Sequence, residues 1–170
     1  MAATPTPRRI VVMGVAGCGK TVVGTLLAAK LGYRFVDADD LHPAANVSKM
    51  AGGTPLDDDD RWPWLDNVGR TLAESSGIVV ACSALKRAYR DRLRAGADDL
   101  AFVHLSGSRE LLEQRMGSRT EHFMPTSLLD SQLGTLEPLE ANERGIEVDI
   151  TPAPTVLVTE ILEKLGSTHG

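Results

Sequence analysis

The sequence is poor in cysteine and contains no long apolar run. Its 170 residues include two cysteines, Cys18 and Cys82, and neither lies in a C-x-x-C or other metal-type spacing. Reduced thiols are expected, although spacing alone leaves a bridge between the two open. No stretch reaches the ~18 apolar residues of a membrane span, and residues 1–9 lack the apolar core of a signal peptide. The sequence therefore predicts a cytoplasmic protein without a membrane partner.

Positive charge is also in short supply. Eighteen Lys and Arg stand against 23 Asp and Glu, a net charge of -5, which argues against a nucleic-acid partner. An acidic protein that binds anions must gather its basic side chains at one place. The length suits one domain, and 42% hydrophobic residues predict that it has a packed core. We expect a flexible leader at 1–8, a single domain at 9–166 and a tail at 167–170.

Short apolar runs alternate with segments of helical periodicity. The runs predict five buried strands, at 9–13, 33–36, 78–82, 100–105 and 146–150. Helices are expected between and after them, at 20–31, 44–50, about 57–76, 85–94, 109–116, 128–136 and 154–165. Strands that alternate with helices form parallel sheets. The fold class is therefore α/β, a five-stranded parallel sheet flanked by helices on both faces.

A glycine-rich loop follows the first expected strand. It reads Gly14-Val15-Ala16-Gly17-Cys18-Gly19-Lys20-Thr21 and fits G-x-x-x-x-G-K-[ST] at every fixed position. The glycines let backbone N–H groups curl around phosphates, and Lys20 is placed to reach the β- and γ-phosphates. Thr21 can offer its hydroxyl to Mg²⁺, while Cys18 is expected to be a small spacer and not a nucleophile. The loop predicts a nucleotide-binding P-loop protein.

Features of a GTPase are missing. The sequence contains no N-K-x-D for guanine, and the D-x-x-G match at 66–69 falls in the middle of an expected helix. The third strand ends in Cys82-Ser83, where many P-loop proteins carry an acid for Mg²⁺. Ligands of open α/β sheets lie beyond the carboxyl ends of the strands. Asp37 and Asp39, just past the second strand, are therefore the candidates for that acid.

Polar segments that follow other strands predict an acceptor side. Lys86 and Arg90 are four residues apart on an expected helix, and an anion bound between them would explain two cations on one face. A solvated surface helix is the alternative. The acidic run 57–60 is expected mainly to cap the next helix, with Pro63 in its first turn.

Several of these segments together resemble the gluconokinase family. The resemblance rests on GVAGCGKT, DADDLHP, NVSKM, PLDDDDRWPWL, CSALKRAYRDRLR and HFMPTSLLDSQLGTLEP, which cover about Arg9 to Leu165. D-x-D-x-L-H-P and A-L-K-x-x-Y-R are the specific motifs, because the P-loop is widely shared. The resemblance implies a P-loop NTPase of the nucleoside-monophosphate-kinase type, similar to shikimate and adenylate kinases, with a lid at about 117–126. It also implies a homodimer, with ATP and D-gluconate as substrates and 6-phosphogluconate as product.

Roles for individual residues follow from this resemblance and from the demands of phosphoryl transfer. Lys20, Mg²⁺ and a lid arginine, Arg119, supply positive charge, and Arg115 lies near adenine. Asp39 accepts the hydroxyl proton, and Asp37 holds Mg²⁺ directly or through water. Asp39 is also expected to contact gluconate. The carboxylate of gluconate is expected to bind four cations: Lys49, Arg61, Lys86 and Arg90. Its hydroxyls are expected to contact His42, His122 and Gln132. Trp62, Trp64 and Tyr89 are expected to pack and not to stack on ligands.

Two other functions remain open at this point. A sister kinase could act on another small acceptor, such as shikimate or a nucleoside monophosphate. A non-catalytic nucleotide-binding regulator would bind ATP without turnover that depends on an acceptor.

Overall fold

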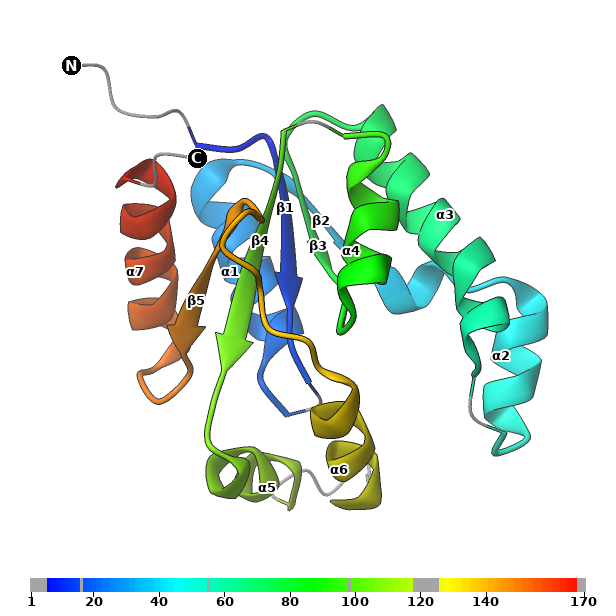
Figure 1. The fold of residues 1–170 in the computed structure, drawn as a ribbon. Helices are drawn as coiled ribbons and strands as arrows, with labels where there is room; N and C mark the ends of the chain where they lie inside the picture. Colours follow the sequence, from blue (N-terminus) through cyan, green and yellow to red (C-terminus); the bar gives the residue numbers. More distant parts are fainter. Residues whose placement is uncertain (1–5, 16, 55, 98, 118–125, 168–170) are drawn as a thin grey trace.

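Five parallel strands form one sheet in the order β2-β3-β1-β4-β5 (Figure 1). The computed structural model describes residues 6–15, 17–54, 56–97, 99–117 and 126–167. The strands are β1 (Arg9–Met13), β2 (Arg34–Asp37), β3 (Ile78–Ala81), β4 (Leu100–Ser106) and β5 (Gly145–Asp149). The predicted five-stranded parallel sheet is thus confirmed.

Helices alternate with these strands as the periodicity predicted. They are α1 (Lys20–Leu31), α2 (Ala44–Ala51), α3 (Asp58–Glu74), α4 (Arg87–Arg94), α5 (Arg109–Gly117), α6 (Thr126–Thr135) and α7 (Pro154–Ser167). Each begins and ends within about two residues of the predicted bounds, the scatter that is usual at helix ends. A 3₁₀ turn, η1 (Ala38–Leu41), follows β2 and was not predicted.

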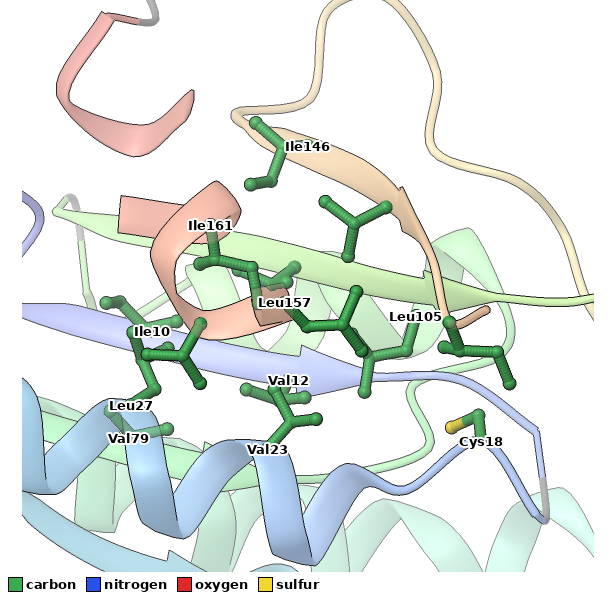
Figure 2. Close-up of a cluster of buried hydrophobic side chains, with 14 of the residues drawn as sticks. Ile10, Val12, Cys18, Val23, Leu27, Val79, Leu105, Ile146, Leu157 and Ile161 are labelled. Atoms are coloured by element: carbon green, nitrogen blue, oxygen red, sulfur yellow. The ribbon is translucent and has the colours of Figure 1, made fainter. Parts of the chain in front are cut away.

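The helices cover both faces of the sheet. Side chains of β1 alternate between two cores: Ile10 and Val12 face one, while Val11 and Met13 face the other. Figure 2 shows the first core, in which side chains of α1 and α7 meet the sheet. In the second, residues of α3 and α4 cover the opposite face. Central parallel strands are buried on both sides, which explains their continuous apolar sequence.

The chain order brings several loops to the carboxyl edge of the sheet. β1 lies between β3 and β4, so the connections after β1 and β3 leave the sheet side by side. The backbone N–H of Gly14 donates to the carbonyl of Ser83 at 3.3 Å, which joins the loop after β1 to the loop after β3. Ligands of open α/β sheets bind at such a point.

Two local expectations are corrected by the structure. Because α3 begins at Asp58, Pro63 occupies the sixth helical position and lies in the second turn, not in the first. Part of the expected leader is anchored: Pro7 is buried, and its carbonyl accepts a hydrogen bond from the Tyr33 hydroxyl at 3.1 Å. The carbonyl of Arg8 accepts from the N–H groups of Gly77 and Ile78.

Candidate active site

The glycine-rich loop has a backbone that only glycine can follow at its two ends. A Cβ atom on Gly14 would lie 2.7 Å from Cys18 Sγ and 2.8 Å from the carbonyl oxygen of Leu105, well inside contact distance. Gly19 has a φ of 89°, in the left-handed region that disfavours other residues. The motif glycines are therefore required by packing and by backbone conformation.

Helix α1 begins directly after this loop, and its first turn is open to an anion. In the described part of the loop no side chain caps the helix, and its first turn contains no acid. The free N–H groups and the helix dipole therefore give this end a positive potential. Lys20 adds a full charge: its Nζ lies 3.0 Å from the carbonyl oxygen of Gly14 and 3.3 Å from that of Val15.

Cys18 is a packing residue within the loop. Its side chain is buried at the loop end of the core in Figure 2. Burial raises the pKa of the thiol, so it stays protonated at neutral pH. Cys82 is also buried, which raises its pKa to about 12, and both cysteines are free. These environments agree with the predicted spacer role of Cys18 and with reduced thiols.

Oxygen atoms suited to Mg²⁺ meet beside the loop. Thr21 Oγ1 donates to Asp37 Oδ2 at 3.4 Å, and the other oxygen of Asp37 accepts from the N–H of Asp39 at 2.9 Å. Hydroxyl and carboxylate oxygens are ligands that Mg²⁺ prefers, and the ion commonly takes the rest from phosphates and water. The described residues contain no cluster of three or more acidic, His or Cys side chains that could hold a metal alone. The pair thus fits an ion that arrives with a nucleotide.

Asp39 lies in η1, at the same edge of the sheet. Its carboxyl reaches solvent, yet surrounding protein atoms partly desolvate it and raise its pKa, and the charge of Asp37 adds to the rise. His42 follows at the end of the turn and stacks on Trp64 with ring centroids 4.4 Å apart. A carboxylate and an imidazole therefore stand together beyond β2, where the polar motif predicted them.

Arg61 and Lys86 are brought together by one carboxylate. Asp58 Oδ2 lies 3.4 Å from Lys86 Nζ, and its Oδ1 lies 3.5 Å from the Arg61 guanidinium. The Tyr89 hydroxyl donates to the same Oδ1 at 2.5 Å and accepts from Arg61 at 3.1 Å. Both cations are about one-third exposed. Two positive groups and a hydroxyl therefore surround one accessible anionic position.

Lys49 has a different partner. Its Nζ lies 2.5 Å from Asp60 Oδ2 and 3.8 Å from Asp57, and the Asp60 contact raises the pKa of Lys49. Asp57 and Asp60 also form a capping box at the start of α3. The predicted capping role of the acidic run is confirmed for these two residues. Lys49 consequently packs against the cap of α3.

Arg90 is in the interior and does not reach the solvent. Its guanidinium is fully buried, with Nε 2.7 Å from Glu143 Oε1 and another nitrogen 3.0 Å from Oε2. It also donates to the carbonyl oxygens of Ala84 and Leu85 at 2.9 and 3.3 Å. Lys86 precedes the first residue of α4, so the two cations do not form the expected pair on one helix face. This burial argues against the predicted contact between Arg90 and a substrate.

The contacts of Arg90 instead hold the loop that carries Lys86. Ala84 is buried at a φ of 44°, a left-handed conformation that is uncommon for a residue with a side chain. Hydrogen bonds from a buried guanidinium to the carbonyls of Ala84 and Leu85 stabilise this conformation. Arg90 therefore positions the segment from which Lys86 projects.

Other expected site residues lie farther along the chain. Arg115 is half-buried on α5 and donates to the carbonyl oxygen of Ile150 at 2.7 Å. Gln132 is half-buried on α6. Ala16, Arg119 and His122, together with most of the expected lid, lie outside the described residues. The predicted packing of the aromatic residues is confirmed: Trp64 and Tyr89 are buried, and Trp62 packs against their core.

Three residues at or near the site were given no role in it by the sequence. Asp58 was one of four consecutive acids with nothing to distinguish it. Asn46 is buried on α2, and no local pattern predicts that. Glu143 lies in an irregular segment, and its partner Arg90 is 53 residues away. Only the chain's tertiary structure reveals these contacts.

Comparison with known proteins gives one consistent family. A family model described as an AAA domain matches residues 10–139. A probable gluconokinase of Xenopus tropicalis is 51% identical over 89% of this chain and 90% of its own length. A gluconokinase of Gluconobacter oxydans is 47% identical over 92% of this chain and 90% of its own length. The chain belongs to the gluconokinase family. The resemblance of its motifs is thus confirmed.

Solved structures of the gluconokinase family and beyond it share this fold. A crystal structure of a gluconokinase from Sinorhizobium meliloti matches with a TM-score of 0.88 at 50% identity, covering 95% of this chain and 93% of the other. Shikimate kinase from Bacteroides thetaiotaomicron matches with a TM-score of 0.68 at 17% identity, covering 92% and 97%, and this shows the fold alone. Within the described residues, every helix is too short or too polar to span a bilayer.

Proposed function

We propose that the protein transfers the γ-phosphoryl group of ATP to the 6-hydroxyl of D-gluconate, giving 6-phospho-D-gluconate and ADP. The observation that carries this proposal is the match to gluconokinases at about half identity over nine-tenths of both chains. The structure adds an open helix N-terminus for phosphates and, across the carboxyl edge of the sheet, two accessible cations for a small acid.

The nucleotide side would supply charge neutralisation and alignment. The loop from Gly14 to Thr21 would hold the phosphates, with Lys20 at the β- and γ-phosphates. Thr21 and Asp37 would hold Mg²⁺, which when bound neutralises phosphate charge. Arg115 stays the candidate for a contact near adenine.

The acceptor side would position the hydroxyl and receive its proton. Asp39 is the proposed acceptor: the gluconate oxygen forms a bond to the γ-phosphorus, the bond to ADP breaks, and the hydroxyl proton passes to the carboxylate. A raised pKa makes this carboxylate a better base than an ordinary aspartate. His42 and Gln132 are proposed to contact substrate hydroxyls.

The carboxylate of gluconate is proposed to bind at Arg61 and Lys86. These cations already share one carboxylate, Asp58, so their spacing suits a carboxylate group. Lys49 stays a weaker candidate, because Asp60 holds it at the cap of α3. A closing lid that carries Arg119 and His122, a homodimeric assembly and a cytoplasmic location remain part of the proposal.

An ADP-release assay with a panel of acceptors tests the function. We expect turnover with ATP, Mg²⁺ and D-gluconate, and much less with other aldonic or aldaric acids, shikimate or nucleoside monophosphates. Faster turnover with one of these other acceptors would identify the protein as a related kinase with a different substrate. ATP binding without turnover by any acceptor would favour the non-catalytic regulator. Omission of gluconate measures background hydrolysis.

A further inference from the structure

Asn46 is a buried polar residue on α2 whose orientation is fixed by a backbone group. Only 4% of its surface is exposed. Its Nδ2 donates to the carbonyl oxygen of Asp60 at 2.8 Å and lies 3.2 Å from His42 Nδ1. A carbonyl oxygen can only accept, so the amide nitrogen, and not the amide oxygen, must face it. The same nitrogen therefore faces the imidazole.

This orientation determines which nitrogen of His42 carries the proton. An amide nitrogen can only donate, so His42 Nδ1 must accept and is unprotonated. The single proton of the neutral ring then lies on Nε2. Trp64 fixes the plane of the ring by stacking at an interplanar angle of 13°, and its own indole N–H donates to the carbonyl of Ala38 at 2.7 Å. Asn46 thus fixes the tautomer of His42, and Trp64 fixes the plane of its ring.

The electrostatic surroundings keep the ring neutral. Burial lowers the pKa of His42, the charge of Arg61 on α3 lowers it further, and the carboxylate of Asp39 in η1 acts in the opposite direction. From α2, the N–H of Asn46 would face a second N–H if Nδ1 were protonated. Neutral His42 offers one donor, the Nε2–H. The side chains of His42 and Asp39 are close enough to shift each other's pKa.

We infer that Asn46 is a positioning residue that holds His42 as the Nε2–H tautomer, so that this N–H donates to a hydroxyl oxygen of the acceptor substrate beside Asp39. The inference rests on the proposed function for the identity of that substrate. A hydroxyl whose proton is directed to Asp39 keeps lone pairs that can accept from His42. Such a donor selects an acceptor with a hydroxyl at that place over one without it.

Nitrogen-resolved NMR of ¹⁵N-histidine-labelled protein tests the arrangement without any turnover. We expect His42 in the wild type to show an unprotonated Nδ1 and a protonated Nε2 at neutral pH. Asn46→Asp presents an acceptor to Nδ1, so the proton should move there or the ring should become charged. A wild-type ring protonated at Nδ1, or a tautomer that ignores Asn46→Asp, overturns the inference.

Kinetics then connect the tautomer to the substrate. If the proton of His42 moves to Nδ1 in Asn46→Asp, the KM for gluconate should rise about ten-fold, the loss of one hydrogen bond, with the KM for ATP unchanged. A charged ring keeps its Nε2–H and should leave both KM values near those of the wild type. The matched control is Asn67→Asp, because Asn67 Nδ2 also donates to a backbone carbonyl, that of Leu41, at 3.0 Å, and its side-chain partner is Arg70 and not a histidine ring. An equal rise in KM in the control would overturn the inference.

A second variant guards against misfolding. Asn46→Ser keeps a donor that can also accept, so both tautomers of His42 should be populated and the gluconate KM should rise by a smaller factor. Two populated tautomers with an unchanged KM for gluconate would contradict the inference. Failure of the proposed function is recognised separately, as a wild-type protein that does not turn over gluconate.

Discussion

Helices α1 and α3 both begin at the carboxyl edge of the sheet, but only the N-terminus of α3 is capped by acidic side chains. α1 starts after Gly19 with no acid in its first turn. α3 starts after Asp57 with three acids in its first turn and a capping box to Asp60. The dipole favours an anion at either end. In α3 the chain supplies the anion itself, and in α1 the end is left for a phosphate.

The same contrast extends to the two halves of the site. On the nucleotide side, backbone groups and one lysine have the proposed roles, and glycine is required by space and conformation. On the acceptor side, each described cation with a proposed role has a carboxylate partner: Lys49, Arg61, Lys86 and Arg90. A single substitution on the nucleotide side should therefore abolish turnover. A single substitution on the acceptor side should instead change the KM for gluconate or the stability of the protein.

The largest effect is expected for Lys20→Ala. It removes the only full charge that the described loop offers to the phosphates, so kcat should fall by about 1,000-fold or more while the protein stays folded. Lys30→Ala, in the last turn of the same helix, is the matched control and should be near normal. Steady-state kinetics with circular dichroism measure both. A folded Lys20→Ala protein with near-normal kcat would show that the loop does not act in transfer.

Arg90→Ala should destabilise the protein by about 3–5 kcal/mol, because it leaves the carboxylate of Glu143 buried without its main partner. The free energy of unfolding, from denaturant titration, is the measurement. Arg92→Ala removes another ion pair between α4 and α3, which is nearly half-exposed, and should cost less than about 1 kcal/mol. Similar losses in the two variants would mean that the buried pair has no special role.

The same buried pair predicts a loss of stability in acid. Burial acts to raise the pKa of Glu143, but hydrogen bonds from Arg90 and from the N–H of Glu140, together with the nearby charge of Arg94, outweigh it and lower the pKa from 4.5 to about 2. The folded carboxylate thus binds its proton more weakly than the unfolded one. Its contribution, about 3 kcal/mol, is complete above pH 4.5 and is lost as the pH falls toward 2.

Unfolding titrations at several pH values measure this loss. Glu143→Gln removes the titrating group, so the decline between pH 4.5 and 2 should become shallower by that amount. An unchanged slope in Glu143→Gln would assign the acid sensitivity to other carboxylates. Glu140→Gln is the control, because its side chain is mostly exposed.

A smaller effect, on affinity, is expected for Arg61→Ala. Loss of a charge-assisted contact to the substrate carboxylate costs about 1.5–3 kcal/mol, so the KM for gluconate should rise about 10- to 150-fold while the KM for ATP is unchanged. Lys86→Ala should act in the same direction. A rise in the KM for ATP alone would reverse our division of the site, and Arg92→Ala again serves as the control.

The same contrast explains which parts could be predicted from sequence. The loop from Gly14 to Thr21 and the strands are local patterns, and the structure has them where they were predicted. The Lys86 and Arg90 pair was derived from helical spacing, but α4 begins only at Arg87. The buried partners of Arg90 are the carbonyl of Ala84 and the carboxylate of Glu143, which is 53 residues away in the chain. Partners that are remote in sequence decide burial, and spacing alone does not reveal them.

The smallest effect is expected for Asp58→Asn, which tests whether the carboxylate of Asp58 competes with the carboxylate of gluconate for the two cations. Asp58 now neutralises part of the charge of Arg61 and Lys86, and at nearly half exposure such a pair contributes only about 0.2–1 kcal/mol. Asp58→Asn should therefore lower the KM for gluconate by up to about five-fold, because the incoming carboxylate no longer competes with a fixed one. The KM for ATP should not change, and neither KM should change in Asp59→Asn, a substitution of the exposed neighbour. If Asp58→Asn instead raises the KM for gluconate, the carboxylate of Asp58 serves to orient the two cations, and its place is not where the substrate binds.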